Sequence, residues 1–115
     1  MTVQLIRNGV RIDGTGADPV ENGAVLIEDG TVKAAGALQS LPQVDGVEEI
    51  DARGGYILPG LIATPVHVMG EGADLIALAQ QPFSYMFYAA IQHLARTLEC
   101  GVTTVRDAGG ADAGV

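Results

Sequence analysis

Cysteine and basic side chains are scarce in this 115-residue chain, and both shortages exclude whole classes of protein. The one cysteine, Cys100, excludes an internal disulfide and a zinc site built from cysteines. The 6 Lys and Arg residues stand against 14 Asp and Glu residues, which gives a net charge of −8. That charge argues against nucleic acid or an anionic membrane surface as a partner.

Long apolar runs are also missing. The longest apolar stretch, 56–69, is interrupted by two prolines and by His67, so it is too broken to span a bilayer. The N-terminus has no basic segment followed by an apolar core, and we therefore expect no signal peptide. Together these features predict a cytoplasmic location. A hydrophobic content of 48% with 16 glycines indicates a folded, turn-rich chain, which is one small domain or part of a larger one.

The first half of the sequence has the pattern of short strands joined by tight turns. Asn8-Gly9 and Asp29-Gly30 are strong signals for two-residue hairpins, because both central positions tolerate positive φ. Ala52–Gly55 predicts a third turn. The strands predicted around these turns are 3–7, 10–12, 24–28, 31–35, 47–51 and 56–58. They predict a small all-β unit over about residues 2–58.

The second half changes to a strand–helix–strand pattern. Residues 60–69 are apolar without alternation, as in a strand buried on both faces, and 102–105 reads as a second strand. Between them we expect a loop at 70–81 and a helix from Pro82 to Gly101. The apolar stripe expected on that helix comprises Phe83, Met86, Phe87, Ala90, Ile91, Leu94 and Leu98. Two strands alone leave apolar faces uncovered, which indicates the front portion of a larger parallel sheet or barrel.

Two segments resemble one enzyme superfamily. Gly54–Val68, GGYILPGLIATPVHV, is similar to the opening signature of the amidohydrolases, PGLID-x-H-x-H. Thr97–Gly110, TLECGVTTVRDAGG, resembles the end of helix 1 and strand 2 in the prolidase-like and arginine-carboxypeptidase-like branch. The resemblance implies a mixed β and α/β fold. Residues 1–58 would form part of a small N-terminal β-sandwich, and residues 59–115 would form the first strand–helix–strand of a (β/α)8 barrel that is incomplete in this chain.

The resemblance also implies a divalent metal, zinc above all, bound by the paired histidines. Residues i and i+2 of a strand point to the same side, so two such imidazoles can hold one ion. Here the pair falls on positions 65 and 67, and Pro65 has no donor atom, so only His67 maps to a ligand. Ala63 stands where the family has Asp, and the remaining family ligands come from later strands. We therefore predict that this chain alone binds zinc weakly or not at all.

Other chemistry-bearing side chains have ordinary structural interpretations. His93 lies off the apolar stripe, which predicts a solvated helix residue, and Cys100 reads as a small buried apolar residue. Arg106 and Asp107 would end strand 2. A turn residue with a local ion pair is favoured there over a substrate contact.

The loop after His67 carries two carboxylates, Glu71 and Asp74. They could reach a metal as oxygen ligands, although solvated loop carboxylates are the favoured interpretation. Gly109-Gly110 lacks the Lys and the spacing of a phosphate-binding loop.

The resemblance implies hydrolysis of an amide or peptide C–N bond. The substrate would be a small amide: an Xaa-Pro or Xaa-Arg dipeptide or an N-acyl amino acid. The alternative is a non-catalytic fragment or degenerate relative that acts by self-association or partner binding through its uncovered strands and helix face. A third possibility is a product with no function of its own.

Overall fold

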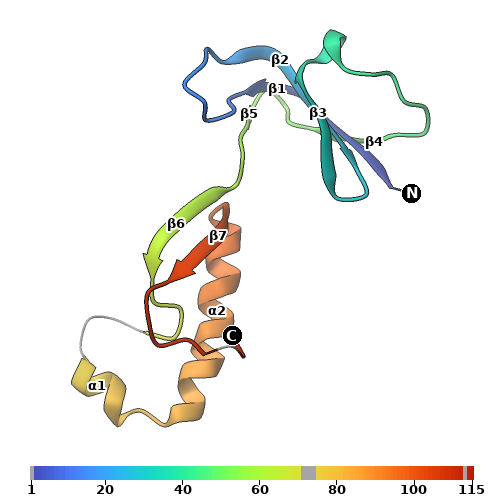
Figure 1. Ribbon diagram of the computed structural model, residues 1–115. Helices are drawn as coiled ribbons and strands as arrows, with labels where there is room; N and C mark the ends of the chain where they lie inside the picture. Colours follow the sequence, from blue (N-terminus) through green and yellow to red (C-terminus); the bar gives the residue numbers. More distant parts are fainter. Residues whose placement is uncertain (1, 71–74, 113) are drawn as a thin grey trace. The chain divides into compact units, whose positions relative to one another are not determined.

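The computed structural model describes residues 2–70, 75–112 and 114–115 (Figure 1). The chain divides into two compact units, Met1–Pro59 and Gly60–Val115. The first unit contains strands and one short 3-10 helix, and the second contains strands and α-helices. The fold is therefore mixed β and α/β, as the sequence predicts. Within the described residues, no helix is long and apolar enough to cross a membrane.

The first unit is one five-stranded sheet with the order β3-β2-β1-β4, in which β5 also pairs with β1. Its elements are β1 (Val3–Arg11), β2 (Val20–Glu28), β3 (Thr31–Ala37), the 3-10 helix η1 (Leu38–Ser40), β4 (Glu48–Asp51) and β5 (Tyr56–Ile57). β1, β2 and β3 form an antiparallel meander. The hairpin predicted at Asp29-Gly30 is confirmed, with φ of 47° and 76° at its two central residues.

The hairpin predicted at Asn8-Gly9 is wrong, because β1 runs straight through these residues. Asn8 does take a positive φ of 60°, but the strand continues on the same partner. Between the pairs Ile6↔Val25 and Gly9↔Gly23, β1 advances by one residue more than β2. The dipeptide therefore makes a β-bulge, in which Asn8 takes the positive φ that a hairpin turn would also have used.

The third predicted turn lies where expected but joins strands that do not pair with each other. β4 and β5 both run parallel to β1, at Gln4–Arg7 and at Val10–Arg11. The intervening residues follow the bulge: the N–H of Ala52 donates to the Arg7 carbonyl at 2.9 Å, and the N–H of Val10 donates to the Gly55 carbonyl at 2.9 Å. The third turn therefore carries the chain past the bulge in β1, from the β4 pairing to the β5 pairing.

The second unit is a strand–helix–strand unit with one additional short helix. Its elements are β6 (Leu61–Val66), α1 (Leu75–Gln80), α2 (Phe83–Glu99) and β7 (Val102–Asp107). β6 and β7 lie side by side as a parallel pair, with α2 beside them (Figure 1). α2 ends as predicted, with Gly101 at a φ of 83°. The loop expected at 70–81 is wrong in its second half, which forms α1.

The core of this unit lies where α2 meets the turn after β6. Val68, Met69 and Ala90 are buried, and the side chains packed against them are Val66, Met86, Phe87, Leu94 and Ala111. Only part of the predicted apolar stripe is covered, because Phe83, Ile91 and Leu98 are 70%, 66% and 63% exposed. A helix that packs on a two-stranded sheet can bury only a narrow face.

Candidate functional site

The candidate site lies at the carboxyl ends of β6 and β7. β6 ends at Val66 and His67 follows directly, while β7 ends at Asp107. Because the strands are parallel, both ends lie at one edge of the sheet. The N–H of Ala108 donates to the Val66 carbonyl at 2.9 Å and extends the pairing past the end of β7. The sequence therefore places His67 at a strand end, as the motif predicts.

Pro65 interrupts the pairing just before the site. Between Ala63↔Val105 and Val66↔Asp107, β6 advances three residues while β7 advances two. A proline has no N–H to donate to the neighbouring strand, and such residues occur in sheets mainly at edges and bulges. The prediction that Pro65 disturbs the strand pairing is therefore confirmed. The same residue offers no metal-binding atom on this strand.

Asp107 holds the two turns at this edge together. Its Oδ2 accepts the N–H of Val68 at 2.9 Å, and its Oδ1 accepts the N–H of Gly109 at 2.6 Å. These two donated bonds lower the pKa of the Asp107 carboxyl group, and the nearby His67 lowers it further. Asp107 is thus an anchoring turn residue. The local ion pair predicted with Arg106 is wrong, because the carboxylate is taken up by backbone N–H groups and forms no ion pair in the described structure.

The imidazole of His67 is exposed and fixed through one nitrogen. Its Nδ1 lies 3.0 Å from the carbonyl oxygen of Gly109. A carbonyl oxygen only accepts, so Nδ1 donates and the lone pair of a neutral ring is on Nε2. Metal-binding histidines commonly have this arrangement, with one nitrogen donating to a backbone carbonyl and the other free for the ion.

His93 is not the solvated residue that the sequence predicts. Its side chain is half-buried between α2 and the turn after β6, with Nδ1 3.0 Å from the Val68 carbonyl oxygen. His93 follows Ala90 by three residues and Met86 by seven, so it shares the packed face of α2. An apolar stripe contains hydrophobic residues alone, so His93 falls outside the stripe although it lies on the same face of α2. Its spacing from Met86 and Ala90 is the signal that could have found it.

Cys100 also differs from its prediction. It is exposed rather than buried, and its N–H caps α2 by donating to the Arg96 carbonyl. It follows Glu99, the last residue of α2. No catalytic role is indicated for it.

The described residues could supply one metal ligand but not a complete metal centre. His67 offers a free Nε2 at a strand end, but Pro65 and Ala63 offer no donor atoms. Among the described residues there is no group of three or more His, Cys, Asp or Glu side chains able to hold an ion. Glu71 and Asp74, the candidate oxygen ligands, lie outside the described residues.

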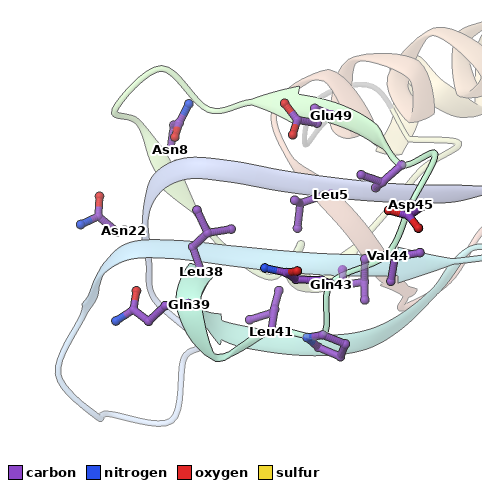
Figure 2. A pocket seen from close by; sticks show the side chains of 13 residues that line it. Leu5, Asn8, Asn22, Leu38, Gln39, Leu41, Gln43, Val44, Asp45 and Glu49 are labelled. Carbon is purple, nitrogen blue, oxygen red and sulfur yellow. The ribbon is translucent and has the colours of Figure 1, made fainter.

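A separate cavity of about 600 Å³ lies in the first unit, over β1 and β2 and beneath the segment that follows β3. Figure 2 shows its lining, which mixes leucines and Val44 with amide side chains. Its carboxylates, Asp45 and Glu49, come from the segment before β4 and from β4 itself. No histidine or cysteine is among the residues that line this cavity, so it offers neither an imidazole nor a thiol.

Comparison with known proteins covers nearly the whole chain. The imidazolonepropionase of Cupriavidus taiwanensis is 33% identical over 102 residues, which are 84% of this chain and 23% of that protein. A crystal structure of an amidohydrolase matches with a TM-score of 0.83 and 34% identity, over 96% of this chain and 26% of that one. A prolidase complexed with N-methylphosphonate-L-proline matches with a TM-score of 0.86 and 29% identity, over 98% and 27%. No protein-family model matches.

A parallel strand–helix–strand unit with an imidazole at the end of its first strand, preceded by a small sheet, defines a class of mixed β and α/β proteins. The matched crystal structures share this fold, and the chain belongs to the amidohydrolase superfamily. It spans about a quarter of the length of these relatives.

Proposed function

We propose that this chain is the N-terminal part of a metal-dependent amidohydrolase that hydrolyses amide or peptide C–N bonds. The observation that carries the proposal is the imidazole of His67, which follows β6 directly and donates from Nδ1 to Gly109 so that Nε2 is free. A divalent ion bound in the intact enzyme would activate a water molecule and polarise the substrate carbonyl. Within this chain, His67 would hold that ion, and Asp107 and Gly109 would hold His67.

We further propose where the two units belong in the intact fold. Residues 1–58 would supply strands of the N-terminal β-sandwich, and residues 59–115 would supply strand 1, helix 1 and strand 2 of a (β/α)8 barrel. The parallel pairing of β6 and β7 with an intervening helix supports the barrel proposal, since this is the repeating unit of that fold. The cytoplasmic location stays a prediction.

The substrate proposed for the intact enzyme is a dipeptide, of Xaa-Pro or Xaa-Arg type, or an N-acyl amino acid. The matched prolidase, complexed with a phosphonate derivative of proline, supports the dipeptide class. The matched imidazolonepropionase has a different name, so the relatives do not point to one substrate. This chain therefore supports the class of bond more than the identity of the substrate.

The chain by itself is proposed to be inactive, because Pro65 replaces the partner ligand of His67. A specific observation supports an additional role in association. Large apolar side chains of the second unit are exposed on both the strand and the helix: Leu61 56%, Ile62 71%, Phe83 70%, Ile91 66% and Leu98 63%. Such surface favours self-association or docking to another chain.

The test begins with the coding DNA beyond the Val115 codon. An open frame with a Lys, further His residues and a late Asp at strand ends supports the proposal. The longer product is then purified with its metal and assayed on Xaa-Pro and Xaa-Arg dipeptides, beside its His67→Ala variant. We expect hydrolysis and bound metal that both decrease in the variant. A longer product without metal and without hydrolysis overturns the proposal, and the association of the 115-residue chain at low micromolar concentration then tests the alternative role.

A further inference from the structure

Two hydrogen bonds hold the turn after β6 at Val68, one to β7 and one to α2. The N–H of Val68 donates to Asp107 Oδ2, and the carbonyl of Val68 lies 3.0 Å from His93 Nδ1. Asp107 ends β7 and His93 belongs to α2, so the helix and the neighbouring strand hold opposite sides of one residue. Val68 is 8% exposed, and water therefore cannot easily replace either bond.

From this geometry we infer that His93 is a positioning residue for the imidazole of His67, an inference that rests on the proposed function of His67 as a metal ligand. His93 does not contact the metal-binding nitrogen. It holds the Val68 carbonyl, one residue after His67, and thereby fixes the backbone from which the imidazole extends. The hydrogen bond from His67 to Gly109 then sets the rotation of the ring.

The chemistry of the bond fixes the protonation of His93. Because the Val68 carbonyl only accepts, the hydrogen of His93 must be on Nδ1. A free histidine side chain favours the other tautomer, with the hydrogen on Nε2. The Nδ1–H tautomer of His93 is therefore a specific signature, which a histidine that simply fills space would not show.

The packing of α2 explains why no other residue can take over this role. The neighbours of His93 on the same face are Ala90, Leu94 and Met86, which have no polar hydrogen to offer. Thr97 lies one turn further along, but its hydroxyl donates to the His93 carbonyl at 2.7 Å. Without His93, the Val68 carbonyl is buried against a face that offers no donor.

The first experiment requires no substitution. Long-range proton–nitrogen NMR spectra of the isotope-labelled 115-residue chain report the tautomer of each of its two histidines. We expect the Nδ1–H tautomer for both His93 and His67. A Nε2–H tautomer at His93 excludes the bond to the Val68 carbonyl and overturns the inference, whatever His67 does.

The second experiment compares two variants with a matched control. His93→Leu removes the donor and keeps an apolar side chain, whereas His93→Asn keeps an N–H near the position of Nδ1. Gln92→Leu makes the same type of change at the exposed neighbouring residue. We expect His93→Leu to convert the His67 spectrum from one tautomer to an averaged pair, with His93→Asn restoring it and Gln92→Leu leaving it unchanged. A folded His93→Leu variant with an unaltered His67 spectrum overturns the inference.

Zinc titration separates this inference from the proposed function. The titration is made with Pro65→His, because the unmodified chain is expected to bind zinc weakly or not at all. The His67 Nε2 resonance is followed as Zn²⁺ is added to Pro65→His and to the double variant that also carries His93→Leu. Loss of a group that orients a ligand weakens metal binding about tenfold or more, and we expect this for the double variant. If Zn²⁺ leaves the Nε2 resonance of Pro65→His unchanged, the ligand role of His67 is refuted, while the tautomer result still decides the role of His93. Equal Zn²⁺ midpoints in Pro65→His and in the double variant, with equal tautomers, overturn the positioning role alone.

Discussion

The carboxylate of Asp107 accepts the backbone N–H of Val68 at 2.9 Å, which ties the end of β7 to the turn after β6. Its second oxygen holds Gly109, whose carbonyl orients His67. One side chain thus connects both turns at the edge where the candidate ligand lies.

Replacing Asp107 with Asn should destabilise the second unit in a pH-dependent way. The pKa of Asp107 is lowered by the N–H groups of Val68 and Gly109 and by His67, so its stabilisation is present above the ordinary pKa of 3.8. It is lost as the pH falls through the lowered pKa of the folded state. We expect Asp107→Asn to melt at a lower temperature than the unmodified chain at neutral pH, with the difference shrinking in acid. Thermal unfolding followed by circular dichroism measures this.

The control is Asp112→Asn, which neutralises an exposed carboxylate that accepts the nearby N–H of Gly114. We expect a smaller loss of stability at neutral pH than in Asp107→Asn. Equal losses in both variants would show that charge alone, rather than the two backbone bonds of Asp107, sets the stability.

Gly60 cannot accept a side chain without disturbing β7. A Cβ atom at Gly60 would overlap Thr103 Oγ1 and Cγ2, and the short, branched Thr side chain has little room to move. We expect Gly60→Ala to lower the free energy of unfolding by about 1 to 3 kcal/mol. Thr103→Ala should recover part of that loss in the double variant. Gly70→Ala is the control, because the atoms of the described residues that its Cβ would meet are those of His67, at 3.4 and 3.6 Å. Denaturant titration contradicts this prediction if the two glycine variants lose the same free energy.

Asp13 should titrate in strong acid. Hydrogen bonds from the Thr15 hydroxyl and N–H, with a contribution from Arg11, lower its pKa from 3.8 to about 2. The stabilisation from this turn is therefore present above pH 3.8 and is lost only as the pH approaches 2. Thr15→Val removes the hydroxyl and should raise the pKa of Asp13 toward its ordinary value. Carbon NMR of the Asp13 carboxyl group measures it, and an unchanged pKa in Thr15→Val would refute the stated cause.

We predict that Pro65 limits metal binding in two ways, by removing a backbone N–H from β6 and by offering no imidazole, and two substitutions distinguish them. Pro65→Ala restores a backbone N–H to β6, and Pro65→His restores the N–H together with an imidazole. We expect calorimetric titration to show weak or no zinc binding by the unmodified chain, a similar result for Pro65→Ala, and tighter binding for Pro65→His. A stoichiometric, submicromolar site in the unmodified chain contradicts the expectation. The same holds if Pro65→Ala gains as much affinity as Pro65→His.

Local signals in the sequence predict those parts of the fold that depend on neighbouring residues. Asp29-Gly30 determines a hairpin and Gly101 ends α2, because each needs only a particular φ at one or two positions. Asn8 has the same conformational preference, but the partners of β1 decide whether a left-handed residue reverses the chain or makes a bulge. Those partners, β4 and β5, lie more than forty residues along the sequence, where no local pattern reveals them.

The candidate site is likewise predictable from the sequence only where it depends on neighbouring residues. The motif predicts that His67 lies at a strand end and that Pro65 disturbs the pairing, because both follow from residue type and strand geometry, and the ligand role of His67 stays a prediction. The anchoring bonds of Asp107 and the donor role of His93 join segments separated by 39 and 25 residues. Its neighbours in the sequence predict that His93 is solvated. Only tertiary packing places it against the Val68 carbonyl.

The parallel pairing of β1 with β4 also has a kinetic consequence. The side chain of Gln4 donates a hydrogen bond to Glu48 across a sequence separation of 44 residues, whereas the β2–β3 hairpin closes through the two residues Asp29 and Gly30. Contacts between distant residues require a long loop to close and form slowly. The meander of β1, β2 and β3 should therefore assemble first, and β1 should wait with one edge open until residues 48–57 arrive. The order of folding in this sheet is therefore set by β1, which pairs with β2 along one edge and with β4 and β5 along the other.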